Sequence, residues 1–245
     1  MVLDEVILTS RYLKIYRKKS EIFWGIIIKI FYPMADKIIV PSKACQMDLV
    51  DNFGIIKNKI VVINNWTLFK KGRIGVKKIY DAIYVGRLDS EKNIDVLLDL
   101  SKKMILVNPD YKQVILGTGN EERRLKRKVR QMKIEKNVLF MGYKKNVGYY
   151  LERSKMFILP SVNEGMPNVV LEAAAYGLPS VINNFLGANE VVINNKTGYI
   201  CNNENEMYNK VLYLSNNENL RIKMGKKASV FIEENFSLKN QNKFI

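Results

Sequence analysis

The residues after Lys78 alternate between short β-rich runs and amphipathic helical patterns, and this alternation limits the possible folds more than any other feature. Runs of β-branched and aromatic residues favour strands, whereas apolar residues three and four apart favour helices. The expected strands are 80–85, 113–116, 138–140, 156–159, 180–182 and 198–200. The expected helices are 93–107, 121–133, 146–153, 168–176, 188–193, 207–215 and 219–234. Strands separated by helices form parallel sheets, so we predict an α/β fold with a doubly wound parallel sheet.

The residues before Lys78 follow a different pattern. Here we expect a helix over 12–32, a strand over 37–41, a helix over 43–53 and a strand over 60–63. Two strands cannot make an independent α/β domain. We therefore expect residues 1–65 to be the remnant of an N-terminal domain whose beginning is absent. Residues 66–78 then form a linker, 79–236 a C-terminal domain and 237–245 a tail.

Histidine is missing from the chain, and cysteine occurs only twice. Ser-His-Asp and Cys-His catalytic sites are therefore excluded, as are zinc sites that use histidine or four thiolates. Cys45 and Cys201 lie far apart in the sequence and follow no signal peptide, so we expect reduced, buried thiols in a cytoplasmic protein. The most apolar stretch, 22–34, is too short to span a bilayer and contains Lys29.

The chain is strongly basic, with 40 Lys and Arg against 24 Asp and Glu and a net charge of +16. This charge suits nucleic acid, an anionic membrane or a phosphate-rich small substrate. It concentrates at 11–19, among aromatic residues, and at 123–130. In the second region Leu125, Val129 and Met132 form an inward stripe, which favours a solvated surface helix over a binding patch. We find no nucleic-acid-binding motif and expect no nucleic-acid partner.

The motif over 164–179 begins where a predicted strand ends and continues into a helix. Pro167 favours the first helical turn, and Gly177 favours its end. Glu164 then lies in the crevice where open α/β sheets bind ligands, and Glu172 reaches the same crevice if its helix face turns toward it. The free amides of Asn168 and Val169 suit an anion such as a diphosphate. The simpler alternative is two unrelated, solvated glutamates.

Two further motifs follow predicted strands. After the strand 80–85, Arg87 and Lys92 are spaced so that both cations reach one phosphate group, although surface cations are common in this chain. After the strand 113–116, Gly117 and Gly119 form a G-x-G turn that lacks the third glycine of a dinucleotide-binding motif. A tight turn explains this second motif as well as ligand contact does.

The order of these motifs resembles the nucleotide-binding half of family 4 retaining glycosyltransferases of the GT-B fold, over roughly 35–236. Within that family the pattern is most similar to bacterial enzymes that extend surface polysaccharides, such as capsule and lipopolysaccharide, or lipid-linked oligosaccharides. The resemblance is carried by the segments 35–42, 60–65, 86–88 with Lys92, 117–119, 140–142, the Glu164 and Glu172 pair, 187–190 and 197–199.

The resemblance implies a role for each motif residue. Glu172 would accept hydrogen bonds from both ribose hydroxyls, and Arg87 and Lys92 would neutralise the diphosphate. Glu164 would lie beside the donor sugar and stabilise positive charge at the anomeric carbon. Other contacts to sugar, phosphate or base would come from Gly165, Met166, Pro167, Asn168, Val169, Gly117, Gly119, Gly142 and Tyr143. No D-x-D motif occurs, so no metal is expected, and no cofactor beyond a UDP- or GDP-linked sugar as co-substrate.

The implied activity is retaining transfer of a sugar to a saccharide or lipid-linked acceptor, with attack on the face that the phosphate leaves. The family's acceptor domain has a full sheet and a glycine-rich loop, which this chain lacks. The alternative is therefore a truncated or non-catalytic nucleotide-sugar-binding fragment, or a subunit of a split enzyme completed by an acceptor-domain chain. The expected location is the cytoplasm, and the stretch 11–24 also suits peripheral contact with an anionic membrane on its cytoplasmic face.

Overall fold

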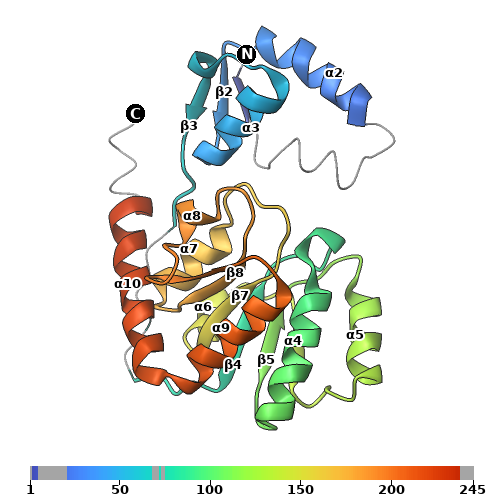
Figure 1. The fold of residues 1–245 in the computed structure, drawn as a ribbon, viewed down its shortest axis with the longest axis vertical. Coiled ribbons are helices and arrows are strands. Elements are labelled where there is room, and N and C mark those ends of the chain that lie inside the picture. The colour runs from blue at the N-terminus through green and yellow to red at the C-terminus, as the bar shows by residue number, and fades with distance from the viewer. Residues whose placement is uncertain (1, 5–20, 68–71, 73–74, 238–245) are drawn as a thin grey trace.

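The computed structural model describes residues 2–4, 21–67, 72 and 75–237, which form two parallel sheets with flanking helices (Figure 1). The larger sheet has six strands in the order β6-β5-β4-β7-β8-β9, and the smaller has three in the order β1-β2-β3. All pairs between neighbouring strands are parallel. The predicted α/β fold with a doubly wound parallel sheet is therefore confirmed.

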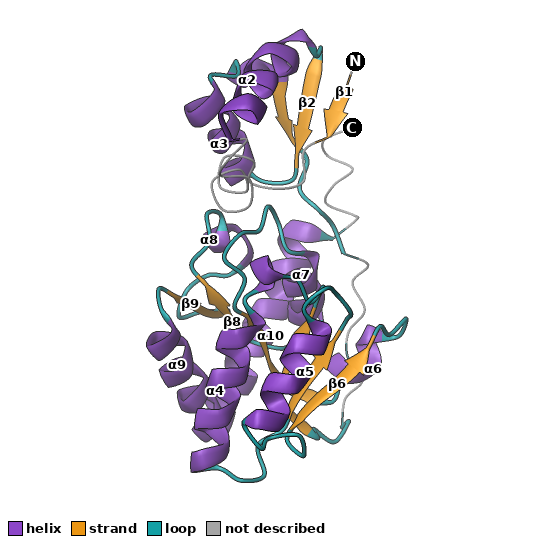
Figure 2. Cartoon of the chain, turned by 90° about the vertical axis from the view of Figure 1, so that its right-hand side faces the viewer, coloured by secondary structure: helices purple, strands orange, loops and turns teal. Residues whose placement is uncertain are grey.

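The elements of the larger unit follow the expected alternation closely (Figure 2). Its strands are β4 (Tyr80–Val85), β5 (Gln113–Leu116), β6 (Val138–Gly142), β7 (Ser154–Leu159), β8 (Ser180–Asn183) and β9 (Gly198–Cys201). Its helices are η3 (Ser90–Lys92), α4 (Ile94–Val107), α5 (Glu122–Gln131), α6 (Val147–Leu151), α7 (Asn168–Ala175), α8 (Ala188–Val191), α9 (Glu204–Asn216) and α10 (Glu218–Phe236).

The strand order creates a switch point between β4 and β7. From β4 the chain moves through β5 to β6 at one edge, and from β7 it moves through β8 to β9 at the other. The loops that leave β4 and β7 therefore diverge, and a crevice forms at the carboxyl ends of these two neighbouring strands. The sheet is buried on both faces, as the full burial of Tyr84, Phe157 and Ile158 illustrates. Such burial explains why these strands read as continuous apolar runs rather than alternating ones.

The smaller unit contains one more strand than expected. Its elements are β1 (Val2–Asp4), α2 (Glu21–Phe31), η1 (Tyr32–Met34), β2 (Lys37–Val40), α3 (Lys43–Phe53), η2 (Lys57–Lys59) and β3 (Ile60–Val62). The prediction of two strands is wrong because β1, which pairs with β2, is only three residues long. So short a run gives no periodic signal. The expected start of the first helix and the basic stretch 11–19 lie outside the described residues.

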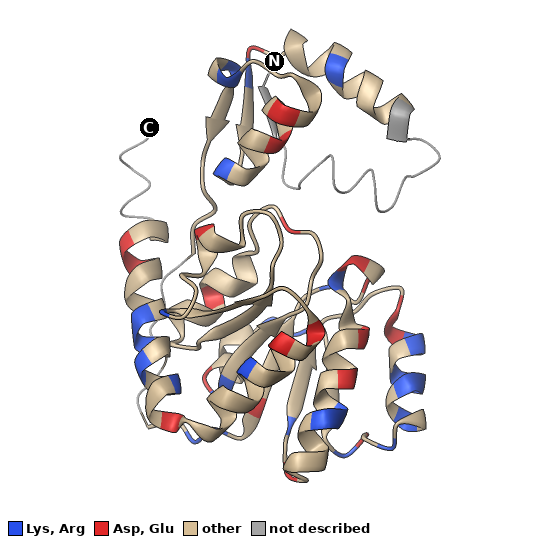
Figure 3. Ribbon diagram, viewed as in Figure 1, with Lys and Arg blue, Asp and Glu red and all other residues tan. Residues whose placement is uncertain are grey.

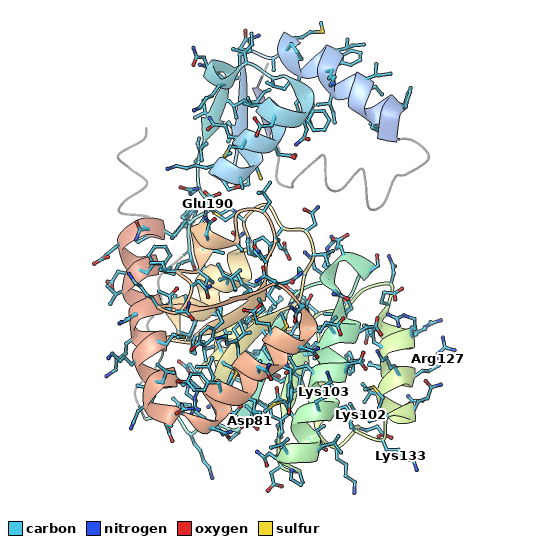
Figure 4. All side chains as sticks on the ribbon, viewed as in Figure 1. Asp81, Lys102, Lys103, Arg127, Lys133 and Glu190 are labelled. Carbon is cyan, nitrogen blue, oxygen red and sulfur yellow. The ribbon has the colours of Figure 1, made fainter. Side chains whose placement is uncertain are left out.

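Hydrogen bonds tie the smaller unit and the linker to the larger unit. The carboxylate of Glu190, in α8, accepts hydrogen bonds from the backbone N–H groups of Lys43 at 3.0 Å and Ala44 at 2.8 Å, in the first turn of α3. Figure 4 shows Glu190 at the end of the larger unit that faces α3. The side-chain amide of Asn65 donates to the Met166 carbonyl. The N–H of Thr67 donates to the carbonyl of Phe236, at the end of α10.

The helix α5 is a strongly basic surface helix (Figure 3), and half of its six cations form ion pairs among the described residues. Leu125 and Val129 are buried, as the apolar spacing predicts. Three of its cations form ion pairs: Lys126 with Glu122 of the same helix, and Arg124 and Lys128 with acidic residues of α4. These pairs favour the solvated-surface interpretation. In the described part of the chain, no helix has the length and hydrophobicity needed to span a bilayer.

Candidate functional site

The loops after β4 and β5 pack so closely that two glycine positions leave no room for a Cβ atom. A Cβ atom at Gly117 would lie 1.9 Å from the carbonyl oxygen of Gly86, and one at Gly119 would lie 2.5 Å from that of Leu88. The N–H of Leu88 donates to the Thr118 carbonyl, and the Glu121 N–H donates to the Leu88 carbonyl, so backbone hydrogen bonds hold the loops together. Gly117 and Gly119 therefore allow the two backbones to approach closely. This packing role supports the interpretation of the G-x-G motif as a tight turn. Whether the two glycines also contact a ligand stays a prediction.

Lys92 and Glu164 meet across the switch point. The Nζ atom of Lys92 lies 2.8 Å from Oε1 of Glu164, and their side chains are only 15% and 13% exposed. The Val162 N–H donates to the carbonyl of Glu91, which draws the loop after β7 toward η3. The two residues that the sequence assigns to the phosphate and to the sugar are thus direct neighbours.

Arg87 lies at the same edge of the sheet but points into solvent. Its side chain is 70% exposed and forms ion pairs with Asp89 of the same loop at 3.0 Å and with Glu91 of η3 at 2.6 Å. Exposed pairs of this kind contribute little to stability, so the guanidinium is able to change partners. The Arg87 carbonyl accepts a 2.8 Å hydrogen bond from the buried hydroxyl of Tyr84, which fixes the backbone beneath it.

The loop between β7 and α7 presents backbone donors. Gly165, Met166 and Pro167 are buried, whereas Asn168 is exposed and Val169 partly so. Within the described ranges, no side chain caps the start of α7. Among the described residues, nothing accepts a hydrogen bond from the N–H groups of Asn168 or Val169. Two free N–H groups at the positive end of a helix can hold an anionic oxygen.

Glu172 lines a pocket of about 480 Å³ between α6, α7 and the linker. Its side chain is half-buried and forms no hydrogen bond or ion pair within the described part of the chain. Burial raises the pKa of the carboxyl because the charged form loses water without gaining a partner. Such a carboxylate is free to accept hydrogen bonds from a ligand.

The pocket also contains residues that the sequence analysis did not single out. Trp66 and Thr67 line it from the linker, Lys145 and Asn146 from the loop before α6, and Tyr176 from the end of α7. The aromatic and amide residues of this set belong to no recognisable sequence motif, because they come from separate segments that only the fold brings together. Neither Gly142 nor Tyr143 lines this pocket. Gly142 adopts a left-handed conformation with φ 67°, and the neighbouring Tyr143 is 72% exposed.

The arrangement combines three chemical elements at one edge of the sheet. Lys92 supplies a cation, the start of α7 supplies amide donors, and Glu172 supplies a hydrogen-bond acceptor. Together they can bind a phosphorylated ligand that carries vicinal hydroxyl groups. Among the described residues, no three His, Cys, Asp or Glu side chains are grouped as metal ligands.

Comparison with known proteins agrees with this description. Residues 64–230 match the family model described as glycosyl transferases group 1. An uncharacterized glycosyltransferase of Haemophilus influenzae is 33% identical over 202 residues, which cover 81% of this chain and 57% of that protein. The N-acetylgalactosamine-N,N'-diacetylbacillosaminyl-diphospho-undecaprenol 4-alpha-N-acetylgalactosaminyltransferase of Campylobacter jejuni is 31% identical over 188 residues, covering 74% and 50%.

The fold of this chain also agrees with that of solved glycosyltransferase structures. A mutant of S. aureus TarM, solved in complex with Fondaparinux, alpha-GlcNAc-glycerol and UDP, superposes with a TM-score of 0.87 at 23% identity. The match covers 99% of this chain and 49% of TarM. The expected GT-B fold is therefore confirmed, although the chain spans only about half the length of the relatives that it matches. Since the family model covers most of the chain, this protein belongs to the group 1 glycosyl transferases.

Proposed function

We propose that this chain binds a nucleotide-diphosphate sugar and supplies the donor half of a retaining glycosyltransferase. The observation that carries the proposal is the unpartnered, half-buried carboxylate of Glu172 in its pocket. Keeping such a group without a partner costs stability, and a ligand with two adjacent hydroxyl groups would remove that cost. The ribose of a nucleotide has this pair of hydroxyls.

The diphosphate would extend from Glu172 toward the switch point. There the amides of Asn168 and Val169 would hold phosphate oxygens, and Lys92 with Arg87 would neutralise the charge that develops on the leaving group. These residues would act without a metal ion or a cofactor. Glu164 would exchange its ion pair with Lys92 for hydroxyl groups of the donor sugar.

The transfer itself would break the bond between the anomeric carbon and the phosphate oxygen. An acceptor hydroxyl would form the new bond on the same face, and the departing phosphate would take its proton. Glu164 would stabilise positive charge on the sugar as the two bonds exchange. No histidine is required by this route.

The acceptor in this proposal is a saccharide or a lipid-linked sugar of a surface polysaccharide. The Campylobacter relative bears the name of an enzyme that acts on a diphospho-undecaprenol-linked sugar. Because the chain is shorter than its relatives, transfer would need an acceptor domain, supplied by more of the same polypeptide or by a second chain. A binding fragment without activity of its own is the alternative function.

The proposed location is the cytoplasm, with peripheral contact to the cytoplasmic face of the membrane. Support comes from the helix α2, where Phe23, Ile26 and Ile30 are all more than half exposed. This apolar face, next to the basic sequence 11–19, suits an anionic lipid surface. Co-sedimentation with vesicles would test this membrane contact. Binding that does not change with anionic lipid content or with salt concentration would contradict an electrostatic attraction to the membrane.

Calorimetric titration of the 245-residue chain with UDP- and GDP-sugars tests donor binding, with and without a chelator. We expect binding that the chelator leaves unchanged, and a weaker affinity in the Arg87→Ala variant. A requirement for magnesium or manganese would overturn the assignment of Arg87 and Lys92. A radiolabelled-donor assay on this chain and on a form completed with an acceptor domain tests transfer, which we expect only from the completed form.

A further inference from the structure

The linker residue Trp66 stands in the same pocket as Glu172. Its side chain is 47% exposed, and it shares the pocket with the loop before α6 and with the face of α7 that carries Glu172. An indole that is partly exposed at the wall of a pocket offers a broad, flat apolar face on which a ligand ring can stack. The pocket volume of about 480 Å³ leaves room for a flat ring beside it.

Both neighbours of Trp66 are fixed. The side-chain amide of Asn65 donates to the Met166 carbonyl at 3.2 Å, and the N–H of Thr67 donates to the Phe236 carbonyl at 3.1 Å. Thr67 is also buried. These bonds tie the backbone on each side of Trp66 to the larger unit. A preorganised aromatic wall loses little conformational freedom when a ligand stacks on it.

The loop before α6 offers hydrogen-bond donors to the same pocket. The Oδ1 atom of Asn146 accepts a hydrogen bond from the N–H of Tyr149 and caps α6, which turns the NH₂ group to other partners. The ammonium of Lys145 is exposed beside it. This side of the pocket therefore favours a ring edge that carries acceptors, such as the two carbonyl oxygens of uracil.

We propose that Trp66 is a base-stacking residue for uridine nucleotides, with Lys145 and Asn146 selecting the base through its carbonyl oxygens. The inference rests on the proposed function, because it places the base in the pocket where Glu172 would hold the ribose. It assigns a binding role to the linker between the two sheets. Uracil carries two carbonyl oxygens on a single ring, whereas guanine carries one and adenine none, each on a larger double ring, so their diphosphates bind less tightly.

The test uses the fact that Trp24 and Trp66 are the two tryptophans of the chain. The Trp24→Phe variant leaves Trp66 as the only indole, and Trp66→Phe leaves Trp24, which packs partly buried in the smaller unit. Both are titrated with UDP while tryptophan fluorescence is excited on the red edge of its absorption, and binding is measured independently by calorimetry. We expect saturable quenching in Trp24→Phe and none in Trp66→Phe.

Calorimetry measures how much each side chain contributes to UDP affinity. Trp66→Ala should weaken UDP binding on the order of 10-fold or more, as expected for loss of one base stack. Trp66→Phe should keep most of the affinity, and Trp24→Phe should match the parent chain. Asn146→Asp keeps the helix cap but replaces the donor by an acceptor, so it should weaken UDP binding and reduce the preference for UDP over GDP and ADP.

The outcomes separate this inference from the proposed function. If UDP binds by calorimetry while Trp66 fluorescence stays unchanged and Trp66→Ala keeps full affinity, the stacking role is wrong and the donor site stands. Equal affinities for UDP, GDP and ADP in the parent chain would overturn base selection by Lys145 and Asn146. If the parent chain binds none of the three, the proposed function fails, and this inference fails with it.

Discussion

The ammonium of Lys92 lies 2.8 Å from the carboxylate of Glu164, so the cation expected to bind phosphate is already neutralised before any ligand arrives. A diphosphate that enters the site must replace this carboxylate as the partner of Lys92. Breaking this ion pair therefore weakens the binding of a nucleotide that carries no sugar. A donor sugar would offset this loss, because its hydroxyl groups would form hydrogen bonds with Glu164.

The first prediction concerns this pair. A position of Glu164 beside the donor sugar, which the resemblance implies, predicts only that its loss spares the bare nucleotide. The ion pair with Lys92 predicts in addition that Glu164→Gln increases UDP affinity by roughly 10-fold, about 1.4 kcal/mol. The same variant should bind the UDP-sugar no more tightly than UDP. Lys92→Ala should act in the opposite direction, weakening UDP and destabilising the fold, because it leaves Glu164 unpaired. Calorimetry on both variants checks this, and weaker UDP binding by Glu164→Gln would rule out the competition.

The second prediction concerns the pH dependence of Glu172. Burial raises its pKa above the usual 4.5, so the folded state binds this proton more tightly than the unfolded chain. The contribution of Glu172 to stability is therefore full below about pH 4.5 and is lost as the pH rises through the higher folded-state pKa. Glu172→Gln should raise the melting temperature at about pH 7 but not at about pH 4.

The same substitution should damage binding. It removes the carboxylate that would accept two ribose hydroxyls, so UDP affinity should fall by about 1.5 to 3 kcal/mol. In the parent chain, UDP affinity should also decline as acid protonates Glu172, and Glu172→Gln should lack this decline. Differential scanning fluorimetry and calorimetry across the pH range measure both effects. A less stable Glu172→Gln variant at neutral pH would contradict the unpartnered state of the carboxylate.

The third prediction concerns backbone packing beneath the site. Gly117→Ala places a Cβ atom 1.9 Å from the Gly86 carbonyl oxygen at a φ of 126°, so it should lower the free energy of unfolding by roughly 3 kcal/mol or more. Gly142→Ala is the matched control, because its φ of 67° is also left-handed but no atom lies within 4 Å of the added Cβ. It should cost only about 1 to 2 kcal/mol. Urea denaturation compares them, and equal losses would exclude the packing explanation.

The fourth prediction concerns the contact between the units. Glu190→Ala removes the acceptor of the Lys43 and Ala44 N–H groups, so hydrogen exchange at these two amides should accelerate. The stability of the smaller unit should fall by about 1 kcal/mol, as when a helix loses its cap. Glu206→Ala serves as the control, since its carboxylate accepts the Asn202 N–H within the larger unit. Unchanged exchange at Lys43 and Ala44 in Glu190→Ala would show that the contact does not form in solution.

The alternation of strands and helices could be predicted from the residues alone, because each β-rich run and each amphipathic helical stripe is a local pattern. The bounds of Tyr80–Val85, Gln113–Leu116 and Lys43–Phe53 agree with expectation to the residue. The motifs also located Glu164, Lys92 and Glu172 at strand ends and on the following helix. Parallel sheets bring such ends to one edge, so the position of the site followed from the order of the elements.

Which side chains contact one another became known only from the folded chain. Nothing local pairs Lys92 with Glu164, 72 positions apart, or joins Glu190 to the start of α3, because both contacts depend on how the loops and units pack. The strand Val2–Asp4 is too short to give a local signal, and only its pairing with β2, which is distant in sequence, defines it. The sequence pattern placed Trp66 in an irregular linker, whereas in the folded chain it lines the pocket that contains Glu172. Long-range packing fixes these neighbours, and a linear pattern carries no record of them.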